Sequence, residues 1–132
     1  MRYDELINSD MQTRIPEASA CIQEAAICVN NDAFRGAMVM ARAALEVTLE
    51  WAGFHNHLLS DKVASAVAAG ALSAHDQTRA TNVRLIGNFG AHGSAAQYVP
   101  GDEQMTITDA KYAVEASSET VKKILRWRPP GP

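Results

Sequence analysis

The chain has few aromatic residues, few cysteines and no long apolar run, and these absences exclude several classes of protein. Aromatic residues make up 6% of the 132 residues, and no stretch alternates regularly between apolar and polar residues, so an extended β-sheet is not expected. No segment approaches the roughly 20 apolar residues of a membrane span, and the start of the chain lacks the apolar core of a signal peptide. We therefore expect a cytoplasmic protein with no membrane partner.

The two cysteines, Cys21 and Cys28, lie seven residues apart. On a helix this spacing places them on one face, about 10 Å apart along the axis. That separation is too large for a disulfide within the helix. Free, buried thiols in a reducing compartment are therefore expected.

The residues that are abundant favour helices. Hydrophobic residues make up 47% of the chain and charged residues 20%, which is typical of a globular protein. Much of the apolar content is alanine, the strongest helix former. The length fits one domain, and because its core is thin we expect it to self-associate. The predicted fold class is all-α.

Apolar periodicity and capping residues predict four main helices and one short helix within a domain that spans residues 15–128. Residues 1–14 are expected to be a polar, irregular N-terminal extension, and residues 129–132 a C-terminal tail. The helices are expected at 16–29, 34–52, 61–69 (the short one), 74–91 and from 109 onward. The expected caps are Ser60, the Ser73–Asp76 capping box and Thr108 at helix starts, and Gly53 and Gly70 at helix ends.

Small residues mark the inward side of the helix expected at 74–91. Gly87 and Gly90 lie inside this helix, where each glycine costs roughly 1 kcal/mol relative to alanine. This cost suggests a compensating reason, and the small side of the helix allows another backbone or another subunit to approach closely.

The formal net charge of −3 excludes a general polyanion binder, so any nucleic-acid contact requires a local basic patch. A candidate patch lies near the C-terminus and consists of Lys122, Lys123, Arg126 and Arg128. The alternative is that these cations only complement the dipole of the last helix.

The segment from Arg84 to His92 has the composition of a chemical site. Arg84, Asn88 and His92 follow one another at four-residue steps, which forms a slanted polar row along one side of a helix. Arginine suits phosphate, histidine moves a proton near neutral pH, and asparagine can orient the histidine or a sugar. The alternative is that His92 binds the last helix carbonyls and the row is merely an exposed face.

Other candidate positions carry less chemistry. Arg42 and Glu46 lie one turn apart, either as a surface pair or as a buried pair that supports the site. The loop histidines His55 and His57, with His75, lack the ligand spacing of a zinc site, so neither a metal nor a cofactor is expected.

Several strings resemble the bacterial domain of unknown function 4145 over about residues 14–126. The most specific string is Arg84-Leu85-Ile86-Gly87-Asn88-Phe89-Gly90-Ala91-His92, and the other matching strings are Ile15-Pro16, Glu24-Ala25, Arg35-Gly36-Ala37, the run from Ala41 to Glu46, and Thr108-Asp109-Ala110. That family resembles the HEPN superfamily. The resemblance implies an antiparallel bundle of four main helices plus one short helix, which acts as a homodimer.

Many HEPN proteins are metal-independent ribonucleases, and others are inactive dimerisation or nucleotide-binding modules. The active pattern has an arginine immediately before the polar residue that aligns with Asn88, whereas this chain has Gly87 there and its nearest arginine at Arg84. Two hypotheses follow from the resemblance. The first is a ribonuclease of a bacterial or phage conflict or restriction system that uses Arg84, Asn88 and His92. The second is an inactive helical dimer that binds a partner protein, a nucleotide or a nucleic acid.

Overall fold

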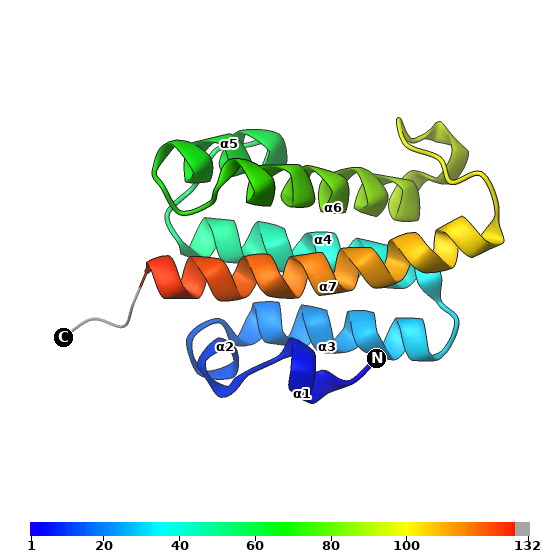
Figure 1. Ribbon diagram of the computed structural model, residues 1–132, viewed down its shortest axis with the longest axis horizontal. Coiled ribbons are helices and arrows are strands. Elements are labelled where there is room, and N and C mark those ends of the chain that lie inside the picture. Colours follow the sequence, from blue (N-terminus) through cyan, green and yellow to red (C-terminus); the bar gives the residue numbers. More distant parts are fainter. Residues whose placement is uncertain (129–132) are drawn as a thin grey trace.

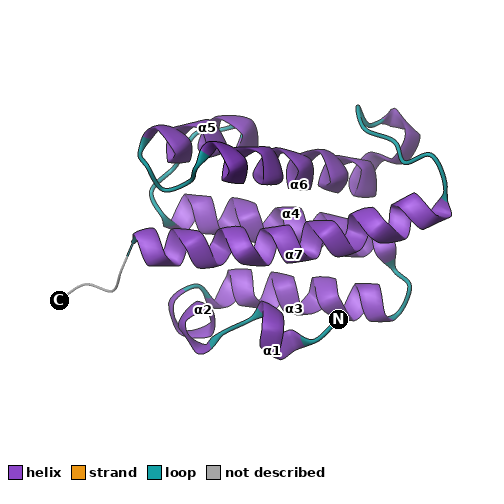
Figure 2. Ribbon diagram, viewed as in Figure 1, coloured by secondary structure: helices purple, strands orange, loops and turns teal. Residues whose placement is uncertain are grey.

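The computed structural model describes residues 1–128, and all regular structure in this part of the chain is helical (Figures 1 and 2). The four long helices lie side by side, and each runs opposite to the long helix before it in the sequence (Figure 1). They are α3 (Pro16–Asn30), α4 (Phe34–Trp51), α6 (Ala74–His92) and α7 (Glu103–Trp127). The shorter elements are α1 (Tyr3–Leu6), α2 (Ser9–Arg14), α5 (Leu59–Ala68) and the 3-10 turn η1 (Gly93–Ala95). The prediction of an all-α fold is confirmed, while the predicted tail at 129–132 lies outside the described residues.

Helix α4 is central, because it packs against α3, α6 and α7. Its buried positions follow the helical period of the sequence, and several of them are alanines, which let the neighbouring helices approach closely. Ser117 of α7 donates a hydrogen bond of 2.7 Å to the Ala41 carbonyl of α4 within this core. The buried residues of α4 are Ala37, Met38, Ala41, Ala44, Leu45, Thr48 and Leu49.

The two glycines predicted to end helices do so. Gly53 and Gly70 have φ angles of 103° and 84°, which L-residues with a side chain rarely adopt. After α4, the Phe54 amide donates to the Leu49 carbonyl at 3.0 Å, and the Gly53 amide donates to Glu50 at 3.1 Å. This pattern is the Schellman motif, which satisfies carbonyls left free at a helix end.

Two predicted caps are wrong. Helix α5 begins at Leu59 with Leu58 as its N-cap, two residues before the expected cap Ser60. Helix α7 begins at Glu103, because the Asp102 carboxylate accepts a hydrogen bond of 2.9 Å from the Met105 amide. Thr108 therefore lies inside the helix, where its hydroxyl donates to the Gln104 carbonyl. An aspartate in an extended conformation caps at least as well as a threonine does, and here Asp102 acts in place of the expected Thr108.

The expectation that residues 1–14 are irregular is also wrong, since this segment forms α1 and α2. Asn8 caps α2 by accepting from the Met11 amide at 2.8 Å. Three apolar side chains among the polar ones are buried against the long helices, namely Leu6, Ile7 and Met11. The Ser118 hydroxyl of α7 donates to the Leu6 carbonyl at 2.5 Å. Tertiary burial thus orders helices that would be too short to be stable alone.

Both cysteines lie on α3 and are free. Cys21 is buried and Cys28 is half-buried. Burial raises the pKa of the Cys21 thiol, and the carboxylates of Glu17 and Glu24 raise it further. None of the helices within residues 1–128 is both long and apolar enough to cross a membrane.

Candidate functional site on helices α4 and α6

The predicted polar row lies on the second half of α6. Arg84 and Asn88 are half-buried, and His92, the last residue of the helix, is exposed. Within residues 1–128, none of these three side chains forms a hydrogen bond or an ion pair with another residue. In particular, His92 does not bind the final carbonyls of α6, which was its alternative role. The row is therefore free to contact a ligand.

The row is too long for its two ends to act together in one chain. Arg84 and His92 are eight residues apart, which corresponds to about 12 Å along the axis of a helix. Asn88 lies between them and can reach either side of a bound group. A single small anion therefore contacts one end of the row, unless a second molecule brings the other end closer.

The glycines of α6 are explained by contact with α4 of the same chain. A Cβ atom placed on Gly90 would lie 2.7 Å from the Arg35 carbonyl oxygen and 2.9 Å from the Met38 Cβ. A Cβ atom on Gly87 would lie 2.5 Å from the Arg42 Cβ. All three distances are shorter than van der Waals contact allows, so a larger residue at either position would force the two helices to shift. The sequence predicted that either another backbone or another subunit approaches this surface, and in the structure it is α4 of the same chain.

Arg35 of α4 stabilises the contact between α4 and the end of α6. Its Nε donates to the Gly90 carbonyl at 3.0 Å, and its guanidinium lies 5.7 Å from the centre of the Phe89 ring, a distance at which a cation attracts an aromatic face. The hydrogen bond satisfies a carbonyl that the end of the helix leaves free.

Arg42 and Glu46 form the predicted ion pair, with 3.3 Å between Arg42 Nη1 and Glu46 Oε2. Their side chains are 34% and 40% exposed, so the pair is neither fully buried nor a freely solvated surface pair. Because the stem of Arg42 lies over Gly87, the structure brings this pair beside the polar row.

The four lysine and arginine candidates near the C-terminus lie apart from the row, and three of them are occupied, Arg128 by a hydrogen bond of 2.5 Å to the Ala52 carbonyl. Lys122 donates to the Glu5 carbonyl at 2.8 Å, and Lys123 donates to Asp76 at 2.6 Å. Arg126 is exposed. The two lysines hold α7 against α1 and α6, so most of the charge of this patch is used within the fold.

Asp76 is the best-anchored polar side chain of α6. It is 4% exposed and forms the predicted capping box, in which the Ser73 amide donates to Asp76 at 2.9 Å and the Asp76 amide donates to the Ser73 hydroxyl at 3.1 Å. Burial by itself would raise the pKa of Asp76, but the hydrogen bonds from Lys123 and Ser73 outweigh it and leave that pKa below its ordinary value.

The histidines of the loop after α4 are not arranged around a metal. His55 Nδ1 lies 2.6 Å from Glu50 Oε1, and the buried Lys62 donates to the other Glu50 oxygen at 2.5 Å. The hydrogen bond from Lys62, followed by that from His55, lowers the pKa of Glu50. Within residues 1–128, no group of three or more histidines, cysteines and carboxylates could hold a metal ion.

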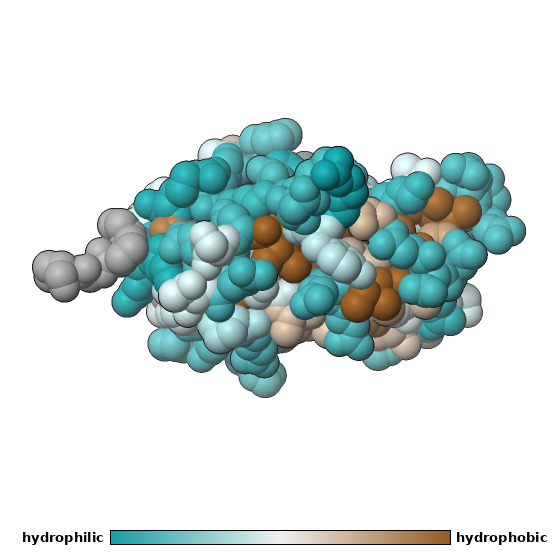
Figure 3. Space-filling view, turned by 90° about the horizontal axis from the view of Figure 1, so that it is seen from below, coloured by the Kyte–Doolittle hydropathy of each residue, from teal (hydrophilic) through white to brown (hydrophobic). Residues whose placement is uncertain are grey.

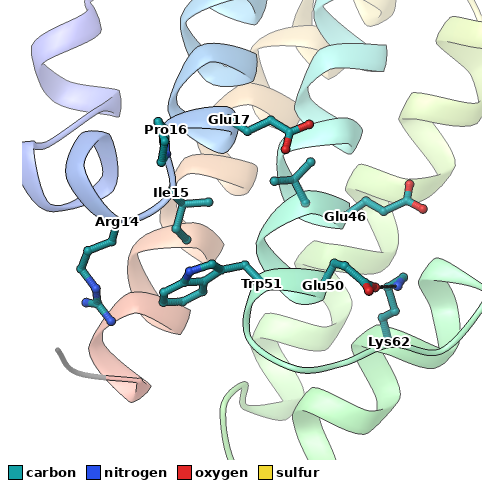
Figure 4. Close-up of a pocket in the computed structure, with 9 residues that line it drawn as sticks. Arg14, Ile15, Pro16, Glu17, Glu46, Glu50, Trp51 and Lys62 are labelled. Atoms are coloured by element: carbon teal, nitrogen blue, oxygen red, sulfur yellow. Dashed lines mark hydrogen bonds and ion pairs between the residues drawn. The ribbon is translucent and has the colours of Figure 1, made fainter. Parts of the chain in front are cut away.

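A groove of about 680 Å³ between α3, α4 and α5 has no counterpart in the sequence-based predictions (Figure 4). In Figure 4 the Trp51 ring extends toward Arg14 at one end, and Glu50 points to Lys62 at the other. The Arg14 guanidinium lies 5.2 Å from the Trp51 ring centre. Local spacing could not reveal this groove, since its residues come from three separate segments of the chain. They are Arg14, Ile15, Pro16, Glu17, Glu46, Val47, Glu50, Trp51 and Lys62.

A smaller pocket of about 270 Å³ lies between α6, α7 and the loop that joins them. Tyr98 donates to Asp109 at 2.5 Å, and Asn82 donates to the Tyr112 hydroxyl at 3.3 Å. Burial, together with the Asp109 carboxylate, raises the pKa of Tyr98 to about 12. Asp109 belongs to one of the strings that carry the family resemblance, but no local spacing in the sequence connects it with Tyr98. The polar groups of this pocket are paired with one another, in contrast to the row.

The outer surface has no large apolar area on the side seen in Figure 3, which is mostly hydrophilic with separate hydrophobic patches. The exposed large hydrophobic residues among those described are scattered over six positions: Tyr3, Ile27, Leu58, Val99, Met105 and Trp127. Single exposed apolar residues are normal on soluble proteins.

The fold and the site together define an all-helical protein in which two antiparallel helices meet at glycines beside a free polar row. The model of one protein family matches residues 23–126, and its description is "domain of unknown function (DUF4145)". The chain belongs to this family. No curated protein and no solved structure matches the chain.

Proposed function

We propose that this protein is a HEPN-like helical module that acts on RNA as a homodimer, in a bacterial or phage conflict or restriction system. One observation carries the proposal. Arg84, Asn88 and His92 have no intramolecular partner within residues 1–128, although they lie on a rigid helix beside the Arg42–Glu46 pair. Polar groups held ready on a rigid element are typical of a binding or catalytic site.

The proposed reaction is metal-independent cleavage of a phosphodiester bond. His92 takes the proton of the RNA 2′-hydroxyl, whose oxygen then attacks the adjacent phosphorus. The bond from phosphorus to the 5′-oxygen breaks, and a second acid protonates this leaving oxygen. Arg84 stabilises the charge that builds on the phosphate oxygens, and Asn88 orients the imidazole or the ribose. The products are a 2′,3′-cyclic phosphate and a 5′-hydroxyl.

Pairing of two molecules addresses the length of the row. Since Arg84 and His92 of one chain are about 12 Å apart along the helix, a two-fold axis near Asn88 would set Arg84 of one subunit close to His92 of the other. The partner's His92 would then supply the acid for the leaving oxygen. The acidic net charge of −3 makes recognition depend on this local site rather than on the whole surface.

A second candidate function is an inactive helical dimer that binds a partner protein, a nucleotide or a nucleic acid. The specific observation in its favour is at Gly87, where a Cβ atom would lie 2.5 Å from Arg42. Position 87 of this fold cannot hold the arginine found in the active pattern. Under this alternative the row binds a ligand but performs no proton transfer.

The test is incubation of the purified protein with mixed RNA substrates in EDTA, beside the variants His92→Ala and His75→Ala. His75 is an exposed histidine at the start of the same helix, so it is a matched control. We expect the parent and His75→Ala to cleave RNA and His92→Ala to lose at least about 100-fold in rate. Absence of cleavage by the parent, with RNA binding that His92→Ala weakens, would favour the inactive dimer instead.

Light scattering tests the dimer separately. The chain has a mass of 14.2 kDa, and we expect twice this mass at micromolar concentration. A single species at the mass of one chain would contradict both candidate functions, because each of them requires two molecules.

A further inference from the structure

Helix α6 has a notch at Gly87 that is filled by an arginine from α4. The Cβ, Cδ and Cγ atoms of Arg42 would lie 2.5, 2.7 and 3.0 Å from a Cβ atom on Gly87. The aliphatic stem of Arg42 therefore lies flat across the backbone of α6. Gly87 is three residues after Arg84 and one before Asn88, so Arg42 crosses α6 beside the polar row, at the level of Arg84 and Asn88.

This contact fixes the stem of Arg42, but several N–H donors of its guanidinium have no hydrogen-bond partner within residues 1–128. A guanidinium has five N–H donors, and the hydrogen bond described for Arg42 uses Nη1, which donates to Glu46 Oε2 at 3.3 Å. Arg42 Nε is buried and has no hydrogen-bond partner within residues 1–128. A buried donor without a partner costs free energy, so the contacts within the fold do not fully satisfy this guanidinium.

The Glu46 contact is weak enough to be exchanged. Its N–O distance of 3.3 Å exceeds the 2.7–2.9 Å of a strong charge-assisted hydrogen bond, and the Glu46 side chain is 40% exposed. Phosphate oxygens match the fork of an arginine better than a carboxylate held at one point does. Glu46 is therefore suited to hold Arg42 in place until an anion arrives.

We propose that Arg42 is the principal phosphate-binding arginine of this site, delivered from α4 across Gly87, and that Glu46 keeps it in position when the site is empty. The ligand is the phosphodiester of a single-stranded RNA. This inference rests on the proposed function and makes it more specific. It also gives Gly87 a role. Because glycine has no side chain, the stem of Arg42 from the neighbouring helix can occupy the space that a side chain at position 87 would need.

The decisive variant is Arg42→Met, which keeps an unbranched apolar stem over Gly87 and removes the charge. Arg42→Lys keeps a charge but loses the planar fork. Arg79→Met is the matched control, because Arg79 is a half-buried arginine of α6 on a different turn. Each protein is assayed for kcat and KM on RNA in EDTA, for binding of an uncleavable 2′-deoxy oligonucleotide by fluorescence anisotropy, and for its melting temperature.

We expect Arg42→Met to lower kcat/KM by about 100-fold, as loss of a donor to a developing oxyanion does, and to weaken oligonucleotide binding by about 10-fold, with a melting temperature close to that of the parent. For Arg42→Lys, kcat/KM and oligonucleotide affinity should lie between those of the parent and those of Arg42→Met. For Arg79→Met, both should equal those of the parent. Parental cleavage and binding in Arg42→Met would overturn the inference while leaving the ribonuclease proposal intact. A parent that neither cleaves RNA nor binds the oligonucleotide would overturn both.

Glu46→Gln tests the same idea without altering Arg42, in case Arg42→Met does not fold. Removal of the competing carboxylate should tighten oligonucleotide binding by about 3-fold or more, because the guanidinium is released and a negative charge next to the phosphate is lost. Binding that is unchanged or weaker in Glu46→Gln would contradict the role assigned to this pair.

Discussion

The two halves of α6 use their polar residues in opposite ways. At the start of the helix, Asp76 is buried and bonded to Ser73 and Lys123. At the end, Arg84, Asn88 and His92 have no partner within residues 1–128, and two glycines replace larger side chains. One half therefore contributes to stability, while the other gives up stability and keeps its polar groups available.

This difference shows where function is to be sought in a small helical protein. Glycines inside a helix cost roughly 1 kcal/mol each, and half-buried polar groups without partners add nothing to folding. Packing against α4 accounts for the two glycines, but no contact within residues 1–128 requires polar side chains at Arg84, Asn88 and His92. Such local inconsistency is typical of functional sites.

The largest expected effect is at the start of α6. Asp76→Ala removes the capping box and leaves Lys123 without its carboxylate, so the free energy of unfolding should fall by about 3 kcal/mol. Asp61→Ala, an exposed acidic residue in the first turn of α5, should change it by less than about 0.5 kcal/mol. Urea denaturation measures both. Equal stability of the two variants would refute the role of Asp76.

Substitution of a glycine at the end of α6 should have the next largest effect. Gly90→Ala places a Cβ atom 2.7 Å from a backbone oxygen of α4, and the resulting strain should exceed the helix-propensity gain and lower stability by about 1–2 kcal/mol. The matched control is Gly36→Ala on α4, whose added Cβ meets only Cys28, with Sγ 3.3 Å away. That variant should be as stable as the parent or slightly more stable. A stabilised Gly90→Ala would show that α4 and α6 do not approach so closely.

Acid should act on the first half of α6 through Asp76. The folded-state pKa of Asp76 is lowered, so its contribution to stability is complete above the unfolded value of about 3.9 and is lost as pH falls through the lower folded value. The difference in stability between the parent and Asp76→Asn should therefore shrink as the pH is lowered below about 4. Urea midpoints between pH 7 and pH 2.5 measure this difference, and a constant difference would contradict the assignment.

The smallest effect on stability is expected in the polar row. Asn88→Ala and His92→Ala remove side chains that have no partner within residues 1–128, so each should change the free energy of unfolding by less than about 0.5 kcal/mol. The same denaturation experiments measure these variants. A loss above 1 kcal/mol would show that the row serves the fold rather than a ligand.

The existence of the four long helices and of α5 was predictable, and so were several helix ends. The Ser73–Asp76 capping box, Gly53 and Gly70 were all placed correctly, since capping depends on residues three or four positions apart. The start of α7 was placed late, because both Asp102 and Thr108 have the chemistry of a cap and the sequence alone does not rank them. Helices α1 and α2 were missed because the burial of Leu6, Ile7 and Met11 depends on α3 and α7.

The candidate site was predictable only as a row on one helix. Its residues follow from the four-residue spacing of Arg84, Asn88 and His92, and the Arg42–Glu46 pair follows from the same rule. The contact of Arg42 with Gly87 joins residues 45 positions apart, and the groove at Trp51 joins three segments of the chain. Spacing along one helix carries no information on such contacts.

The sequence by itself determined the all-helical fold class, the apolar sides of the long helices and the alignment of Arg84, Asn88 and His92 in one row, because each of these depends on the 3.6-residue period within one segment. Tertiary structure decided which groups are used and which remain free. It assigned Lys123 to Asp76, Arg35 to Gly90 and the stem of Arg42 to Gly87. The physical reason is that these pairs form only when whole helices pack, and packing is governed by the combined shape of the buried surfaces rather than by any local pattern.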